Sequence, residues 1–87
     1  MSKSDDELYF ESMNRFIEFA NNLKNEGIKP AVVSSALMSA SAVYATYVAA
    51  GNEGGLTDSG VDKVVEAYRE HLVRVQDARR AENSAAN

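Results

Sequence analysis

Apolar positions recur with helical spacing in three separate stretches of this 87-residue chain. In each stretch they stand three or four residues apart, which is the spacing that gathers side chains on one face of an α-helix. The pattern predicts helices over residues 5–26, 30–50 and 58–80 and contains no convincing β-strand. We expect an all-α protein in which residues 1–80 form one bundle-like domain of three helices. Residues 81–87 lack periodic apolar content and predict a disordered tail.

Residues that typically begin and end helices stand at these limits. Ser4 followed by Glu7 matches a capping box, and Gly27 suits the position just after a helix. Pro30 is typical of a first helical position, and one residue of 57–59 is expected to cap the third helix. The glycines within 51–55 predict a loop.

The first predicted helix carries more apolar surface than one neighbouring helix covers. At 100° per residue, its apolar residues span an arc of about 200°, whereas a helix on one surface needs little more than ~100°. The residues of this arc are Leu8, Tyr9, Phe10, Met13, Phe16, Ile17, Phe19, Ala20 and Leu23. We therefore expect a spare face, near Phe10 and Ile17, to be free for a second molecule.

The second predicted helix carries two apolar stripes on opposite sides. One consists of large residues, namely Val32, Val33, Leu37, Val43, Tyr44, Tyr47 and Val48. The other, which we call the small-residue seam, consists of Met38, Ala42, Ala45 and Ala49. The seam residues are spaced four, three and four apart, as in a heptad, and small side chains let two helices approach closely. We expect a homodimer in which the seam packs on a helix of a second copy, or on the spare face of that copy.

The third predicted helix has one narrow apolar stripe. Its members are Val61, Val64, Val65, Tyr68, Leu72 and Val75. Arg79 falls on the same stripe, so close packing is expected to end near Val75 or Ala78. In an alanine-rich core, tyrosine supplies much of the bulk, and we predict that Tyr47 is mostly buried with a partner for its hydroxyl.

Composition and charge narrow the function classes. The 13 acidic and 9 basic residues give a net charge of −4 and are mixed along the charged helices. No cluster of Lys and Arg is present, so nucleic-acid binding is not expected. The absence of cysteine excludes disulfides and thiolate metal sites, and the single histidine excludes multi-histidine sites. The acidic start, MSKSDDELYF, is unlike a secretion signal, and we expect a cytoplasmic protein.

The segment 30–50 also permits a membrane interpretation. It contains no charged residue over 21 positions, which is long enough to span a bilayer. However, it holds four serines, one threonine and seven alanines, so such a helix gains little from contact with lipid. We expect a helix packed on most of its sides and no membrane association.

Few residues suggest chemistry. His71 has no marked nucleophile or substrate-positioning partner, and glutamates one turn apart (66 and 70, 7 and 11) are typical of solvated faces as well as of cation sites. Four tyrosines could line a ligand pocket. We expect no catalytic, cofactor-binding or metal-binding residues and no enzymatic activity. The interpretation is a non-enzymatic interaction or accessory protein with an unknown protein partner; the alternative is a small-ligand or metal-binding helical protein.

A resemblance to a known family is carried by RFIEFAN (15–21), SSALMSASAVYATYVAA (34–50) and AYREHL (67–72). Over about residues 7–75 the chain resembles the bacterial domain-of-unknown-function family 3144. This resemblance implies a short, all-helical bacterial protein with no assigned activity, and it transfers no functional residues. The middle helix of that family often has Arg-Phe-Asn where this chain has Val43-Tyr44-Ala45, which puts any role of that polar group in doubt here.

Overall fold

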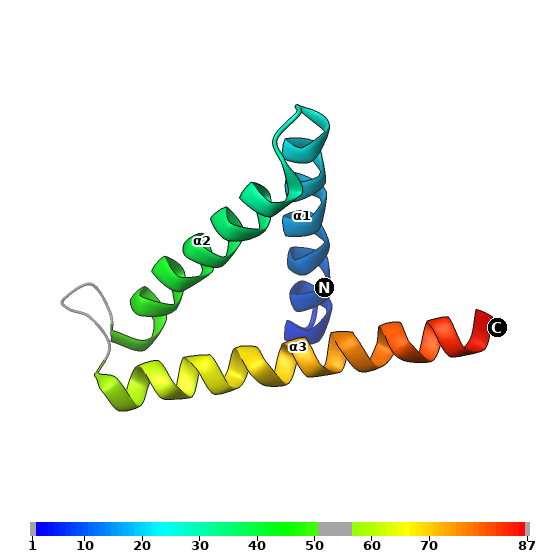
Figure 1. Ribbon diagram of the computed structural model, residues 1–87. Helices are drawn as coiled ribbons and strands as arrows, with labels where there is room; N and C mark the ends of the chain where they lie inside the picture. Colours follow the sequence, from blue (N-terminus) through cyan, green and yellow to red (C-terminus); the bar gives the residue numbers. More distant parts are fainter. Residues whose placement is uncertain (1, 51–56, 87) are drawn as a thin grey trace. The chain divides into compact units, whose positions relative to one another are not determined.

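The computed structural model consists of three helices, α1 (Asp5–Asn25), α2 (Pro30–Ala50) and α3 (Asp58–Ala86) (Figure 1). It describes residues 2–50 and 57–86, with side chains for 2–48 and 57–84. Within these ranges there is no strand, so the prediction of an all-α protein with three helices is confirmed. The loop predicted at 51–55 lies outside the described residues.

The start of α1 follows its capping residue. The Ser4 side chain accepts a hydrogen bond of 3.2 Å from the backbone N–H of Glu7, as the sequence predicts. Acidic residues occupy the first turn, where the positive end of the helix dipole favours them. Lys3 forms an ion pair of 2.6 Å with Glu11, and both side chains are about half exposed (54% and 50%). An exposed pair of this kind stabilises a helix by less than about 1 kcal/mol.

The turn from α1 to α2 is defined by backbone hydrogen bonds. Gly27 has a φ of 100°, in the left-handed region that favours glycine, and its N–H donates to the carbonyl of Lys24 at 3.0 Å. The Ile28 N–H donates to the carbonyl of Leu23 at 3.3 Å. These two bonds form a Schellman motif, so Gly27 ends α1 as predicted. Pro30 then begins α2.

The start of α3 is capped by Thr57, and its end differs from the sequence prediction. The hydroxyl of Thr57 accepts a bond of 3.1 Å from the Gly60 N–H, and its carbonyl accepts one of 2.9 Å from the Val61 N–H. The helix continues to Ala86, whereas we predicted an end near residue 80 and a disordered tail over 81–87. Alanine and glutamate are strong helix formers and extend a helix without an apolar stripe.

The described residues group into two units, 1–43 and 44–87, whose boundary falls inside α2. In the first unit Val33 is buried, at 8% exposure, while Ala20 and Leu23 are half-buried. In the second unit no described side chain is buried, and the most covered are Ala45, Thr46, Gly60 and Val64. The prediction of a single domain over residues 1–80 stays a prediction.

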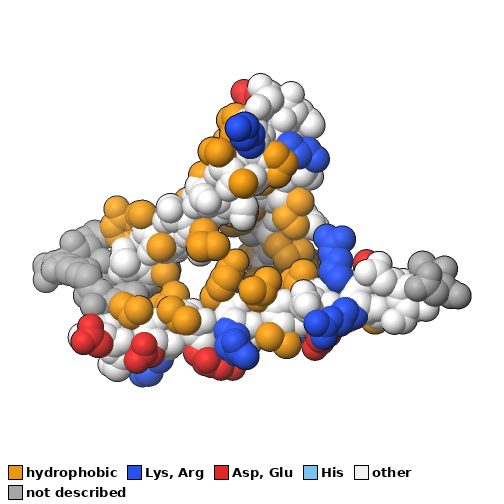
Figure 2. All heavy atoms as spheres, in the orientation of Figure 1, with side chains coloured by type: hydrophobic (Ala, Val, Ile, Leu, Met, Phe, Trp, Pro, Cys, Tyr) orange, Lys and Arg blue, Asp and Glu red, His pale blue; other side chains and the backbone are white. Residues whose placement is uncertain are grey.

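Most large apolar side chains of the single chain contact solvent. Among the described residues, 21 of them are at least 37% exposed, and Figure 2 shows many along the helices on the face in view. Tyr47 is 54% exposed, so the prediction that it is mostly buried is wrong for the single chain. Its ring has an edge contact with Tyr44 on the same helix, with centroids 6.5 Å apart. A contact along one helix leaves the outer ring surface uncovered, because burial needs a second element above it.

Candidate interaction surface

The small-residue seam lies along α2, and its described members are accessible to different extents. Met38 is 54% exposed, Ala42 is exposed and Ala45 is half-buried. The side chain of Ala49 lies outside the described residues. Met38 and Ala42 belong to the first unit, whereas Ala45 and Ala49 belong to the second. The described part of the seam is therefore open enough for another helix to reach it.

The spare face on α1 is also accessible. Phe10 is 57% exposed and Ile17 is 49% exposed. The Phe10 ring makes an edge-to-face contact with Tyr9, with centroids 5.1 Å apart. This contact is between neighbours on one helix, so it orients the aromatic surface without covering it. The assignment of this face to contact with a second copy stays a prediction.

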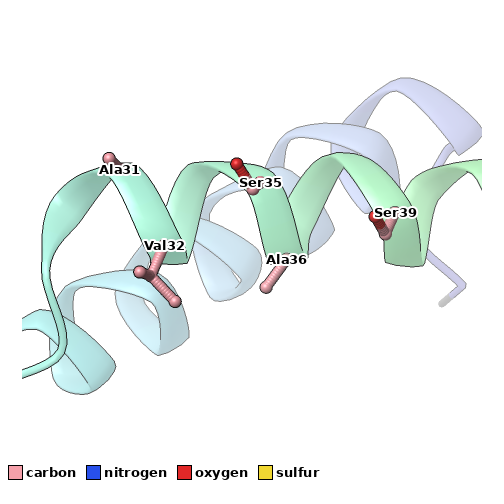
Figure 3. A pocket seen from close by; sticks show the side chains of 5 residues that line it. All are labelled: Ala31, Val32, Ser35, Ala36 and Ser39. Carbon is pink, nitrogen blue, oxygen red and sulfur yellow. The ribbon is translucent and has the colours of Figure 1, made fainter.

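Two surface hollows among the described residues do not resemble a ligand pocket. One is lined by Ala31, Val32, Ser35, Ala36 and Ser39, all from α2 (Figure 3). Another is lined by Ser12, Arg15, Phe16, Glu18, Phe19 and Asn22, all from α1. Small-molecule sites are usually concave and enclose most of their ligand. A hollow on one helix offers walls on one side only, and neither hollow is lined by a tyrosine.

The polar residues considered for catalysis or metal binding do not form a larger cluster in the described part of the chain. Arg74 Nη2 is 3.3 Å from His71 Nδ1, and Arg74 Nε donates to the Glu70 carbonyl at 3.4 Å, all on exposed α3 residues. Among the described residues, no three His, Asp or Glu side chains stand close enough to hold a metal ion. The Arg74–His71 contact was not anticipated, although a three-residue spacing on a helix is a signal for it.

One helix in the described ranges has the length and apolar composition to cross a membrane. It covers Pro30–Val48 in α2. The same composition occurs in a soluble helix whose apolar faces are covered by other helices. The segment carries hydroxyls at Ser34, Ser35, Ser39, Ser41 and Thr46.

The apolar stripe of α3, which the sequence predicted to lie in the core of one chain, is largely exposed. Five members of its predicted stripe, Val61, Val65, Tyr68, Leu72 and Val75, are 45–60% exposed. Val64 is half-buried. The signal for an alternative role was present in the sequence, because Arg79 continues the same stripe. Arginine is seldom fully buried in the core of one chain, so its place at the end of the stripe does not fit a core position.

These observations describe a small all-helical protein whose three helices each carry uncovered apolar side chains. The chain belongs to the family "Protein of unknown function (DUF3144)", whose model matches residues 9–75. The resemblance noted from the sequence is thereby confirmed. No curated protein and no solved structure matches this chain.

Proposed function

We propose that this protein is a non-enzymatic interaction or accessory module of the bacterial cytoplasm that works as a homodimer. The dimer forms through the small-residue seam of α2, which packs on α2 of the second copy or on the spare face of its α1 at Phe10 and Ile17. An unidentified protein partner binds the assembled dimer. The observation that carries the proposal is the contrast between 21 exposed large apolar side chains and one buried side chain, Val33, in the described chain.

The energetics of folding support self-association. Ordering each residue costs roughly 1–2 kcal/mol of conformational entropy, and full burial of a large apolar side chain returns roughly 1.5–3 kcal/mol. Among the described residues one side chain is buried and 21 large apolar side chains are exposed, so much of the apolar surface that could offset this cost remains in contact with water. A second copy of the chain carries the same apolar faces and can cover those of the first. Many homodimers have no stable folded monomer for this reason.

The chemistry of the seam supports its place in the interface. Ala42 and Ala45 have side chains small enough for two helix backbones to approach closely, which increases dispersion contacts between them. Met38 has a flexible side chain that fills irregular gaps at such contacts. None of these side chains is charged, so their burial carries no electrostatic cost.

Sedimentation equilibrium of the full chain tests the proposal. At tens of micromolar we expect a mass of twice 9.4 kDa. Ala45→Glu places a charge at the centre of the seam and should return the mass to that of one chain, or unfold it, because an unpaired buried charge is costly. The matched control is Ser39→Glu, which adds the same charge to an exposed position of α2 about 100° away from Met38.

Two outcomes would contradict the proposal. A wild-type mass of 9.4 kDa at this concentration would exclude the dimer. Equal masses for Ala45→Glu, Ser39→Glu and the wild type, all dimeric, would remove the seam from the interface. Circular dichroism of each variant separates dissociation from unfolding.

Membrane association is a second candidate that one observation favours, namely the length and apolar composition of Pro30–Val48. It predicts that the purified chain floats with lipid vesicles and needs detergent to remain soluble. The homodimer predicts a soluble dimer without detergent, because the same surface is covered by the second copy. A vesicle flotation experiment with the full chain therefore distinguishes the two functions.

A further inference from the structure

The apolar side chains of α3 follow the repeat of a two-helix contact. Val61, Val65, Tyr68, Leu72 and Val75 are spaced four, three, four and three residues apart, and Arg79 follows four residues later. This alternation is that of the inner positions of a coiled coil. The described side chains of the second unit leave these five between 45% and 60% exposed. The α3 stripe, as we call these five residues and Arg79, is thus a regular apolar face open to a second helix.

The stripe is complementary to itself when two copies run in opposite directions. With the register centred on residue 70, Val65 meets Val75 and Tyr68 meets Leu72 of the other helix. Val61 at one end then meets Arg79 at the other. A parallel pair would instead place the two Arg79 side chains against each other, and like charges at a shared inner position are destabilising. The antiparallel direction removes this repulsion.

Charged residues at the two ends of the antiparallel helix pair favour the same register. Arg79 reaches the end of the partner helix that carries Asp62, the residue that follows Val61. Beyond Arg79 the next inner position is Glu82, which would face Asp58, so like charges limit the pairing to residues 61–79. Near the axis the two Arg69 side chains approach each other, and each has Glu66 one turn earlier on its own helix to offset its charge.

We propose that α3 pairs with α3 of a second copy as an antiparallel coiled coil over residues 61–79, closed at each end by Arg79 and the Asp62 of the other chain. This inference rests on the proposed homodimer and identifies a further surface of that assembly, separate from the seam of α2. The paired segment spans about 28 Å at 1.5 Å per residue. A contact between two helices of this length covers apolar surface on both helices and encloses no ligand.

A charge-reversal cycle measured by sedimentation equilibrium tests the end pairs. Arg79→Asp should weaken dimerisation about tenfold, because two attractive pairs per dimer become repulsive. Adding Asp62→Arg to the same chain should restore the dissociation constant to within about threefold of the wild type. Within one α3 the two positions are about 25 Å apart, so only pairing between copies explains the rescue. The matched control, Arg80→Asp, makes the same change at the adjacent position outside the stripe and should leave the dissociation constant within about threefold of the wild type.

Spin-label distances test the direction of the helices without perturbing the stripe. Because the chain has no cysteine, Ala67→Cys and Ala81→Cys each give one label site per copy. Both sites are exposed and lie outside the stripe. Antiparallel helices centred on residue 70 separate the labels along the axis by about 9 Å at residue 67 and about 33 Å at residue 81. Parallel helices give nearly equal distances at the two sites.

The outcomes separate this inference from the proposed function. A dimeric mass with equal or unmeasurably long label distances, or without rescue in the double variant, overturns the α3 pairing and leaves the homodimer in place. A mass of 9.4 kDa for the wild type overturns both. Rescue together with a longer distance at residue 81 than at residue 67 supports the antiparallel coiled coil.

Discussion

The turn between α1 and α2 and the long helix α3 differ in the contacts that stabilise them. Around the turn, Gly27 and Ile28 close a Schellman motif, and Val33 is buried nearby. On α3, the described side chains include apolar residues at regular spacing, and none of them is buried. The first region combines the hydrogen bonds of a turn with a buried side chain, whereas the second has its helical bonds, its cap and exposed contacts of Arg74 with Glu70 and His71.

This difference separates two sources of structure. Local signals determine where a helix begins and ends, and they act within a few residues of the chain. Apolar surface on a helix is stabilising only when another element covers it. The turn has some of that cover within one chain, because α2 folds back at Pro30. The α3 stripe lacks such cover in the described chain, and the antiparallel pairing that we propose would supply it.

Matched valine truncations test the comparison most strongly. Val33→Ala removes two buried carbon atoms and should lower the free energy of unfolding by about 1–2 kcal/mol. Val73→Ala, on α3 at 45% exposure and outside the stripe, should change it by less than about 0.5 kcal/mol. Urea unfolding followed by circular dichroism, at one fixed protein concentration, measures both. Equal losses at the two positions would show that α3 is as well covered as the turn.

Matched glycine substitutions should give smaller effects of opposite sign. Gly27→Ala places a Cβ at a φ of 100°, with no atom within 4 Å of it, so the expected loss of about 1 kcal/mol is backbone strain alone. Gly60→Ala lies in the first turn of α3, where alanine is the better helix former, and should gain about 0.5–1 kcal/mol. Thermal unfolding detects either change as a shift of several degrees in Tm. A neutral Gly27→Ala would mean that the turn accepts another conformation.

Deletion of residues 81–87 should have the smallest effect. The described side chains at 81–84 are exposed, and the α3 stripe that we assign to the coiled coil ends at Arg79. We expect Tm to fall by less than about 2 °C and the dimer mass to decrease only by the residues removed. A loss of several degrees would show that the end of α3 packs against another part of the assembly.

The helix limits were predictable from single residues, and the packing was not. Ser4, Gly27 and Thr57 each bond to backbone groups three or four residues away, and Pro30 has a φ suited to a first helical position. These effects are local and can be recognised in the sequence alone. The end of α3 was missed because we required apolar periodicity, although helix propensity continues the helix to Ala86. The all-α class follows from the helical spacing in all three segments.

The burial of particular side chains lay beyond sequence reasoning. Tyr47 has the size and position of a core residue, yet its exposure depends on which element lies above it, and a sequence does not state that. The exposed character of Met38, Phe10 and Ile17 was anticipated from an excess of apolar surface. Which element or molecule covers them is not encoded in the local spacing of apolar residues, because cover depends on contacts between segments far apart in the chain or between chains.

The scarcity of buried side chains in the described ranges, where Val33 is the one example, has a calorimetric consequence. The heat-capacity change of unfolding scales with the apolar area that becomes exposed, and a compact chain of this length has roughly 1 kcal/mol/K. A separated copy with so little covered area should absorb heat over a broad range with a much smaller step. The assembled protein should instead show a sharp endotherm whose midpoint rises with concentration, because association and folding then become one cooperative event.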